Sequence, residues 1–204
     1  MALRENYLFL AGALSSMPTF SHACFGLQFV RFNLQVERRS GAVDTLPVIC
    51  EERLLPPMFE LGDPLTVEGQ LRAYSQRTEN ATKLMIAAFA QEVHLCTQEP
   101  ENIVELRGAL MRPPVFRSTP LGREIADLFL VVQRSFGKTD YLPVIAWGRN
   151  ARLCGMWQPG DLVEVSGRLQ SRSYHKLQMD GSVREMTAFE VSATIIESNN
   201  NSKP

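Results

Sequence analysis

The sequence predicts an all-β protein made of two tandem copies of one small domain. Two sets of repeated residues predict the duplication. Gly-Ala-Leu at residues 12–14 recurs at 108–110, and Leu-Pro-Val-Ile at 46–49 recurs at 142–145, each 96 positions later. Residues 62–69, which begin with Gly-Asp and end with Gly, recur in outline at 160–167, 98 positions later. A nearly constant offset with a two-residue slip is typical of a repeated domain.

Alternating apolar residues predict the strands of the second copy, over 102–110, 124–134, 141–147, 162–169 and 186–196. Pro113-Pro114 ends the first of them and predicts a loop over 112–119. Residues 135–140 fit a hairpin connection, residues 150–157 one or two helical turns, and Asp180-Gly181 a tight turn. The second copy therefore has three strands, a short helix and two more strands.

The first copy follows the same plan, with strands expected over 7–14, 26–36, 46–50, 65–71 and 84–95. The domains are expected at 1–97 and 102–197, with a linker near 97–101 and a disordered Asn/Ser-rich tail at 198–204. Five antiparallel strands with a short helix between the third and the fourth are the plan of the five-stranded OB-fold barrel. The strand order alone leaves SH3-like barrels and sandwiches open.

Composition limits the class of protein. The chain has 204 residues, 45% of them hydrophobic and 21% charged, as in ordinary globular proteins. The apolar run at 7–14 is interpreted as a strand rather than a targeting segment, and no run approaches the length of a membrane helix. The four cysteines form no CxxC pair and have no spacing typical of a zinc site. Cys50 is expected to be a buried free thiol, and the protein is expected in the reducing cytoplasm.

Catalysis has little support in the sequence. His22, His94 and His175 have no obvious partners, and neither Gly-x-Ser-x-Gly nor a phosphate-binding Gly-x-x-x-x-Gly-Lys occurs. We therefore expect no enzymatic activity, no metal and no cofactor. The charge is uneven: residues 1–101 hold 8 basic and 12 acidic side chains, and residues 102–204 hold 13 and 10. The second copy is thus the better candidate for binding a polyanion.

An ordered set of residues covers essentially all of 102–197. It runs through Gly108, Leu110, Pro114, Arg117, Thr119, Gly122, Leu128, Leu130, Val132 and Arg134, continues with Tyr141 to Trp147-Gly148-Arg149, and ends with Gly160-Asp161, Val163, Val165, Gly167, Leu169, Arg172 and Tyr174. This set resembles the pattern of bacterial single-stranded DNA-binding proteins. The resemblance implies OB-folds that stack bases on aromatic rings and neutralise phosphates with cations.

The resemblance implies stacking positions at Tyr141, Trp147 and Tyr174, with Phe136 near a hairpin tip as a weaker candidate. Tyr141 and Trp147 are six apart on one expected strand, which puts them on the same face. The expected phosphate-binding cations lie on the same strands and hairpins: Arg117, Arg134, Lys138, Arg149, Arg168, Arg172, Lys176 and Arg184. Alternatively, the aromatic rings belong to the core, as we expect for Phe136 and Trp157, and the cations belong to an ordinary solvated surface.

The first copy matches only the scaffold of the pattern. The fixed offsets put Thr45, Glu51 and Gln76 at the places of Tyr141, Trp147 and Tyr174. Ser21 and Ala23 stand at the places of Arg117 and Thr119. Glu51-Glu52 would repel phosphate, so this copy is expected to have a degenerate ligand face and a structural role.

The sequence-based hypothesis is sequence-independent binding and protection of single-stranded DNA in replication, repair, recombination or mobile-element transfer. Family members assemble four OB-folds, so two folds per chain imply a homodimer. The end of the chain carries no acidic recruitment motif. The alternative is a protein-interaction module of a primosome-like complex that binds nucleic acid incidentally. A secreted oligosaccharide-binding OB-fold is a distant third, since neither a signal peptide nor a disulfide pattern supports it.

Overall fold

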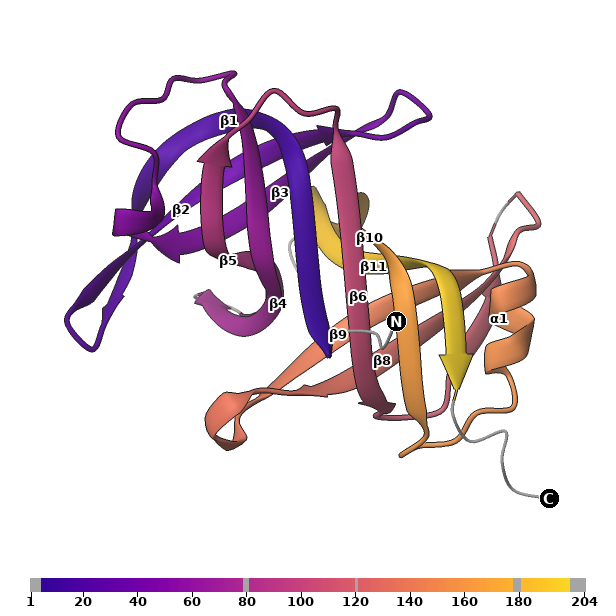
Figure 1. Cartoon of the computed structure of the whole chain (residues 1–204). Helices are drawn as coiled ribbons and strands as arrows, with labels where there is room; N and C mark the ends of the chain where they lie inside the picture. Colours follow the sequence, from indigo (N-terminus) through magenta and orange to yellow (C-terminus); the bar gives the residue numbers. More distant parts are fainter. Residues whose placement is uncertain (1–4, 79–80, 120, 178–180, 199–204) are drawn as a thin grey trace.

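A computed structural model describes residues 5–78, 81–119, 121–177 and 181–198, and it confirms two tandem OB-folds in an all-β protein (Figure 1). The first barrel contains β1 (Asn6–Cys24), β2 (Leu27–Glu37), β3 (Val43–Glu51), η1 (Glu52–Leu54), β4 (Pro64–Thr78) and β5 (Ala81–Leu95). The second contains β6 (Glu101–Leu110), β7 (Val115–Ser118), β8 (Glu124–Gln133), η2 (Ser135–Gly137), β9 (Thr139–Trp147), α1 (Arg149–Cys154), β10 (Leu162–Leu177) and β11 (Val183–Ser198).

Each barrel closes because its first strand pairs with two neighbours. Strand β1 pairs with β2 and with β4, and β6 pairs with β8 and with β10. One pair in each barrel, β3–β5 and β9–β11, is parallel. The expectation of a purely antiparallel unit is therefore wrong at the closing pair, because the chain crosses the barrel through the helical segment and the fourth strand before it returns.

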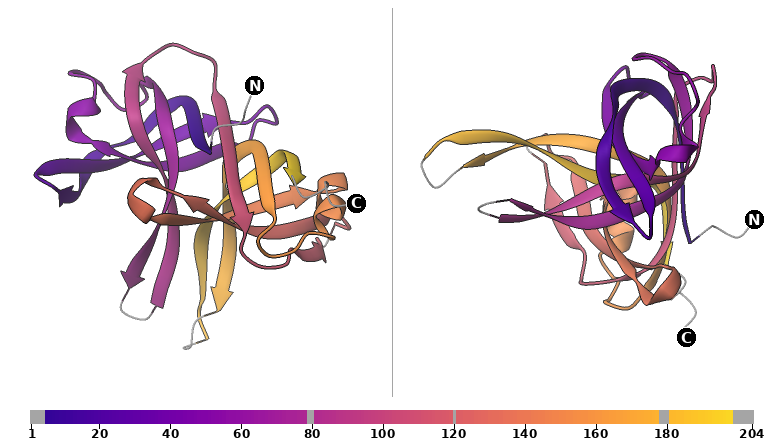
Figure 2. Two further views of the ribbon diagram at one scale, coloured as in Figure 1. Left: turned by 60° about the horizontal axis from the view of Figure 1, so that its bottom comes forward. Right: turned by 90° about the vertical axis from the view of Figure 1, so that its left-hand side faces the viewer.

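Three elements differ from the sequence-based expectations. Residues 115–118, expected in a loop, form β7 and pair with the start of β8. Pro113-Pro114 therefore interrupts the strand structure only over residues 111–114. The short helix is a true α-helix only in the second copy, since η1 is a single 3₁₀ turn. Several strands outrun their predicted ends: β1 continues to Cys24, and β4–β5 and β10–β11 form long hairpins that project on the same side of the molecule (Figure 2). Asp180 and residues 199–204 lie outside the described residues.

The two barrels are joined into one sheet. Strand β1 pairs antiparallel with β6, from Asn6 opposite Leu106 to Ala11 opposite Glu101. The alternating residues of both strands point into the barrels, and Leu8, Leu10, Val104 and Leu106 are fully buried. The buried apolar residues of both barrels belong to one contiguous cluster. The expected linker is therefore short, and the halves pack side by side within the chain.

Two buried carboxylates fasten each barrel to the other. Asp44 of the first barrel accepts hydrogen bonds from the backbone N–H of Ser171 in the second at 2.8 Å, and from Arg38 at 2.6 Å to each carboxylate oxygen. Asp140, 96 positions later, accepts a hydrogen bond from the backbone N–H of Ala73 at 2.8 Å. The side chains of both aspartates are almost completely buried. This reciprocal arrangement fixes the relative orientation of the two outer faces.

The repeated glycines Gly69 and Gly167 have a steric reason. Each lies where the fourth strand of its barrel shifts register against the fifth. A Cβ atom would lie 2.2 Å from the carbonyl oxygen of Phe89 in the first barrel, or 2.2 Å from that of Ser192 in the second. Only glycine allows the two backbones to approach so closely.

Candidate nucleic-acid interface

Trp147 is the last residue of β9, and its indole lies on the outer face of the second barrel. Leu142 and Val144 point into the core, so the alternation along the strand turns Tyr141 and Trp147 outward. The indole is about one-third exposed, and its Nε1–H donates to Ser192 Oγ at 3.2 Å. The ring is therefore held in position while part of its surface stays accessible.

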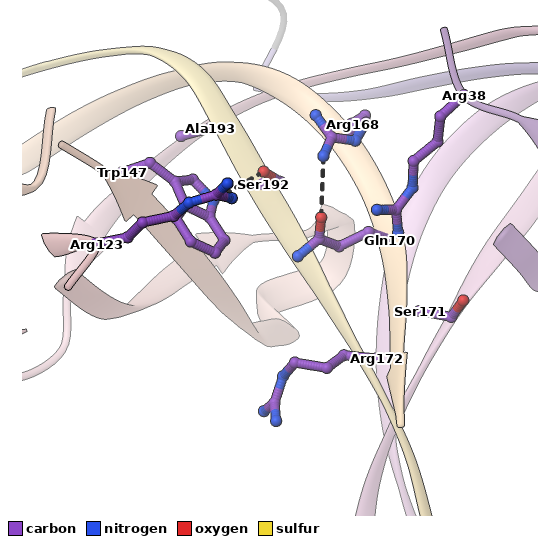
Figure 3. A pocket seen from close by; sticks show the side chains of 9 residues that line it. All are labelled: Arg38, Arg123, Trp147, Arg168, Gln170, Ser171, Arg172, Ser192 and Ala193. Atoms are coloured by element: carbon purple, nitrogen blue, oxygen red, sulfur yellow. Dashed lines mark hydrogen bonds between the residues drawn. The ribbon is translucent and has the colours of Figure 1, made fainter. Parts of the chain in front are cut away.

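Four arginines share an open depression with Trp147 (Figure 3). Arg168 and Arg172 come from β10, Arg123 precedes β8, and Arg38 follows β2 of the first barrel. The depression has a volume of about 450 Å³. Both barrels thus contribute cations to one surface.

Arg168 has the most unusual environment of these arginines. Burial lowers the pKa of its guanidinium, and the nearby charge of Arg38 lowers it further. One Nη donates to Gln170 at 3.2 Å, whereas Nε is buried and has no hydrogen-bond partner within the described part of the chain. A buried donor without an acceptor costs free energy.

The acidic groups around the depression are few and already engaged. Glu190 is 7% exposed and accepts a hydrogen bond from Gln170 at 2.9 Å. It also lies 3.5 Å from Arg172, whose guanidinium stands over the ring of Tyr174, 5.7 Å from its centroid. Arg172 and Tyr174 therefore form a cation–π pair beside the depression.

The other predicted residues do not all converge on this site. Tyr141 is exposed, but six residues along β9 place it about 20 Å from Trp147. Arg134 lies 3.2 Å from Asp140, and Arg117 lies 2.5 Å from Asp127. Lys138, Arg149 and Arg184 are exposed. The side chains of Phe136 and Lys176 lie outside the described residues.

Two residues of the site were missed from the sequence. Arg38 belongs to the first copy, and only the packing of the barrels brings it here. The sequence held one indication of this role: Arg38 stands 96 positions before Arg134, a predicted phosphate-binding residue. That match was interpreted as part of the shared scaffold. Arg123 precedes β8 and has no counterpart in the family pattern. Trp157 packs against the core, so the core interpretation is confirmed for that tryptophan.

Nothing in the described residues suggests a metal site, since no group of three or more His, Cys, Asp or Glu side chains is placed to hold an ion. Cys50 is fully buried, as predicted, and burial raises the pKa of its thiol to about 12. None of the helices described here has the length and apolar character needed to cross a membrane.

Comparisons with known proteins agree with this geometry. The profile of the Single-strand binding protein family matches residues 101–197. The chain is 36% identical over 93 residues to the single-stranded DNA-binding protein of Clostridium tetani, covering 42% of this chain and 63% of that protein. It is 39% identical over 80 residues to single-stranded DNA-binding protein B of Bacillus subtilis, covering 36% of this chain and 71% of that protein.

The fold comparison extends over both barrels. The crystal structure of the wild-type single-stranded DNA binding protein from Thermus aquaticus superposes with a TM-score of 0.76 and 26% identity. The superposition covers 100% of this chain and 97% of that one, so the tandem arrangement is shared as well as the single barrel. The chain belongs to the single-strand binding protein family.

Proposed function

We propose that this chain binds single-stranded DNA without sequence preference and protects it while it is unwound. The observation that carries the proposal is the depression around Trp147, where an accessible indole lies among four arginines. Aromatic rings stack on every base, and arginines neutralise phosphates, so this combination suits a single strand of any sequence.

Within this proposal, Trp147 and Tyr174 stack bases beside the depression, and Tyr141 and Phe136 stack bases nearer the β8–β9 hairpin. Arg168 and Arg172 contact phosphates directly, together with Arg123. Lys138, Arg149, Lys176 and Arg184 extend the positive field along the strands. Arg38, Arg117 and Arg134 take a smaller part, because each already pairs closely with a carboxylate.

The biological setting we propose is replication, repair, recombination or the transfer of mobile elements in the cytoplasm, since unwound DNA occurs in all four processes. We further propose that two chains form a homodimer with four barrels. The similarity of the two barrels to the Thermus aquaticus protein supports a shared architecture. Sedimentation should then give twice the chain mass of 22.9 kDa, and a monomer at micromolar concentration would contradict this assembly.

The function is tested by titrating oligo-dT while the tryptophan emission is recorded. Stacking on Trp147 should quench the emission, and Trp157, which packs against the core, should supply the unquenched remainder. Trp147→Ala should remove most of the quench and weaken binding about 5- to 150-fold, from a stacking energy of about 1–3 kcal/mol per base. Trp147→Phe is the matched control and should keep most of the affinity.

Salt provides an independent test of the arginines. The logarithm of the affinity should fall linearly with the logarithm of the salt concentration, and Arg168→Ala or Arg172→Ala should each reduce the slope by about 0.7. Arg107→Ala, on β6 and paired with Glu164, should leave the slope unchanged. A chain that shows no quench and no binding at low salt would refute the proposal and favour the protein-interaction module.

A further inference from the structure

A buried carboxylate lies beneath the cationic depression of the second barrel. Glu190 is on β11, directly opposite Gln170 of β10, and both residues are more than nine-tenths buried. Their neighbours Leu169 and Val191 point into the core, so alternation along the strands turns Gln170 and Glu190 toward the outer face. A carboxylate at this place is unexpected on a surface that binds a polyanion, because its charge repels phosphate.

Glu190 holds both arginines that β10 contributes to the depression. Its Oε1 accepts a hydrogen bond from the side-chain amide of Gln170 at 2.9 Å, and the amide oxygen of Gln170 accepts one from Arg168 at 3.2 Å (Figure 3). The same Oε1 lies 3.5 Å from Nε of Arg172, whose guanidinium stands over the ring of Tyr174. One carboxylate oxygen therefore holds Arg172 directly and Arg168 through a single amide.

These side chains belong to one row of cross-strand pairs on the outer face. In order along β10 and β11, the pairs are Arg168–Ser192, Gln170–Glu190, Arg172–Ala188 and Tyr174–Met186. Ser192 accepts the hydrogen bond from the indole of Trp147, and Tyr174 stands at the other end of the row. Glu190 therefore lies between the two rings that are expected to stack bases.

The first barrel shows that the fold does not need this carboxylate. Its fourth and fifth strands pair Arg72 with Ala87 at the place where the second barrel pairs Gln170 with Glu190. Ala87 is fully buried, and Arg72 reaches Asp140 of the other barrel at 3.1 Å. The carboxylate is thus peculiar to the barrel that carries the depression, which favours a role in the site over a role in the barrel.

We propose that Glu190 is a positioning residue for DNA binding, which holds Arg168 and Arg172 in the arrangement in which they meet phosphates. A free arginine side chain loses rotamer freedom when it binds a phosphate, and an arginine that is already held loses less. Holding two arginines before the strand arrives raises the affinity by more than the repulsion from one paired charge lowers it. This role rests on the function proposed for the second barrel, and Glu190 itself does not touch the strand.

Two neutral substitutions in the full chain separate positioning from charge. Glu190→Gln keeps an oxygen that accepts from Gln170, whereas Glu190→Met has about the same length and no oxygen. Both remove the repulsion of phosphate, so a difference in affinity between them reports the lost acceptor. Glu190→Gln should bind oligo-dT at least as tightly as the wild type, and Glu190→Met should bind about 3- to 10-fold more weakly than Glu190→Gln. Equal affinities of the two variants would overturn the inference.

The salt dependence of binding gives a readout that a loss of stability alone would not change. Glu190→Met should lower the slope of the logarithm of the affinity against the logarithm of the salt concentration by up to about 1.4, the share of two phosphates. Glu190→Gln should keep the wild-type slope. Glu164→Gln, which removes another carboxylate of β10 from its pair with Arg107, controls for net charge and should behave like the wild type. A wild-type slope in Glu190→Met would overturn the inference.

A measurement without DNA tests the contact through which Glu190 acts. Nitrogen-15 NMR of the arginine side chains should show faster exchange of the Arg172 Nε–H with water in Glu190→Met than in the wild type, because the ion pair that holds it is lost. An unchanged exchange rate would overturn the inference.

The behaviour of the wild type separates this role from the proposed function itself. If oligo-dT neither binds nor quenches the emission of the wild type, the proposed function fails. If the wild type binds and is quenched while Glu190→Gln and Glu190→Met bind alike, only the positioning role of Glu190 fails.

Discussion

Removal of the Asp140 carboxylate should destabilise the whole chain, although the residue lies far along the sequence from its partner barrel. Asp140 is fully buried and accepts hydrogen bonds from the N–H of Ala73 at 2.8 Å and from Arg72 and Arg134 at 3.1 and 3.2 Å. Asp140→Ala would leave two cations and one backbone donor without their acceptor. Breaking a buried pair in this way costs about 3–5 kcal/mol.

That cost corresponds to a measurable change in the melting temperature. In a chain of about 200 residues, each kcal/mol shifts the midpoint by about 2–4 °C, so Asp140→Ala should melt about 10 °C below the wild type. Asp127→Ala removes a carboxylate from the partly exposed pair with Arg117 and should cost no more than about 1 kcal/mol. Equal melting temperatures for the two variants would refute the reasoning that Asp140 holds the barrels together.

Two further predictions concern stability. Burial raises the pKa of Asp44, but hydrogen bonds from Arg38 and Ser171 outweigh this and hold the pKa below its usual range. The ionised Asp44 therefore adds to the free energy of unfolding above about pH 4, and this contribution is lost as the pH falls through the lowered pKa. In urea unfolding between pH 5 and pH 2, the free energy of unfolding should fall more steeply for the wild type than for Asp44→Asn. Parallel dependence on pH in the two proteins would contradict this prediction. Gly167→Ala should destabilise the chain and alter the emission of Trp147, because a Cβ would press on the backbone of Ser192, whose hydroxyl accepts the hydrogen bond from the indole. Ser166→Ala is the control. An unchanged emission spectrum and an unchanged midpoint of thermal unfolding would argue against the close contact.

The fold was predictable because each barrel needs the same residues at the same places. The repeated glycines and the alternating core residues indicated two domains. The alternation also predicted nearly correct positions for the parts of the strands that line the barrels. The strand ends were not, since the β10–β11 ladder runs on to Leu177 opposite Val183 where the hairpin leaves the barrel. Hydrogen bonding continues there, but burial of alternate residues does not, so the periodic signal ends before the strand.

The candidate site was predictable only where it is local in sequence. Trp147 and Tyr174 stand in a recognisable pattern, whereas Arg38 reaches the same surface from the other barrel. The outward aromatic rings of the first barrel, His22, Phe29 and Phe89, were missed for a further reason. The two fifth strands differ in offset from the rest, since Ala88 pairs with Val48 as Val191 pairs with Val144, 103 positions apart. A fixed offset of 96 or 98 therefore never compares Phe89 with Ser192.

Two copies in one chain are free to differ where two identical subunits are not. Asp44 and Asp140 serve the same purpose in opposite directions, because each accepts a backbone hydrogen bond from the other barrel. Loss of either would leave polar groups unpaired at the interface, so the paired arrangement limits change there. The outward positions have no such restriction, and an aromatic ring at Trp147 in one barrel corresponds to Glu51 flanked by two rings in the other. The interface therefore preserves the geometry of the two faces while allowing each face to hold its own set of outward side chains.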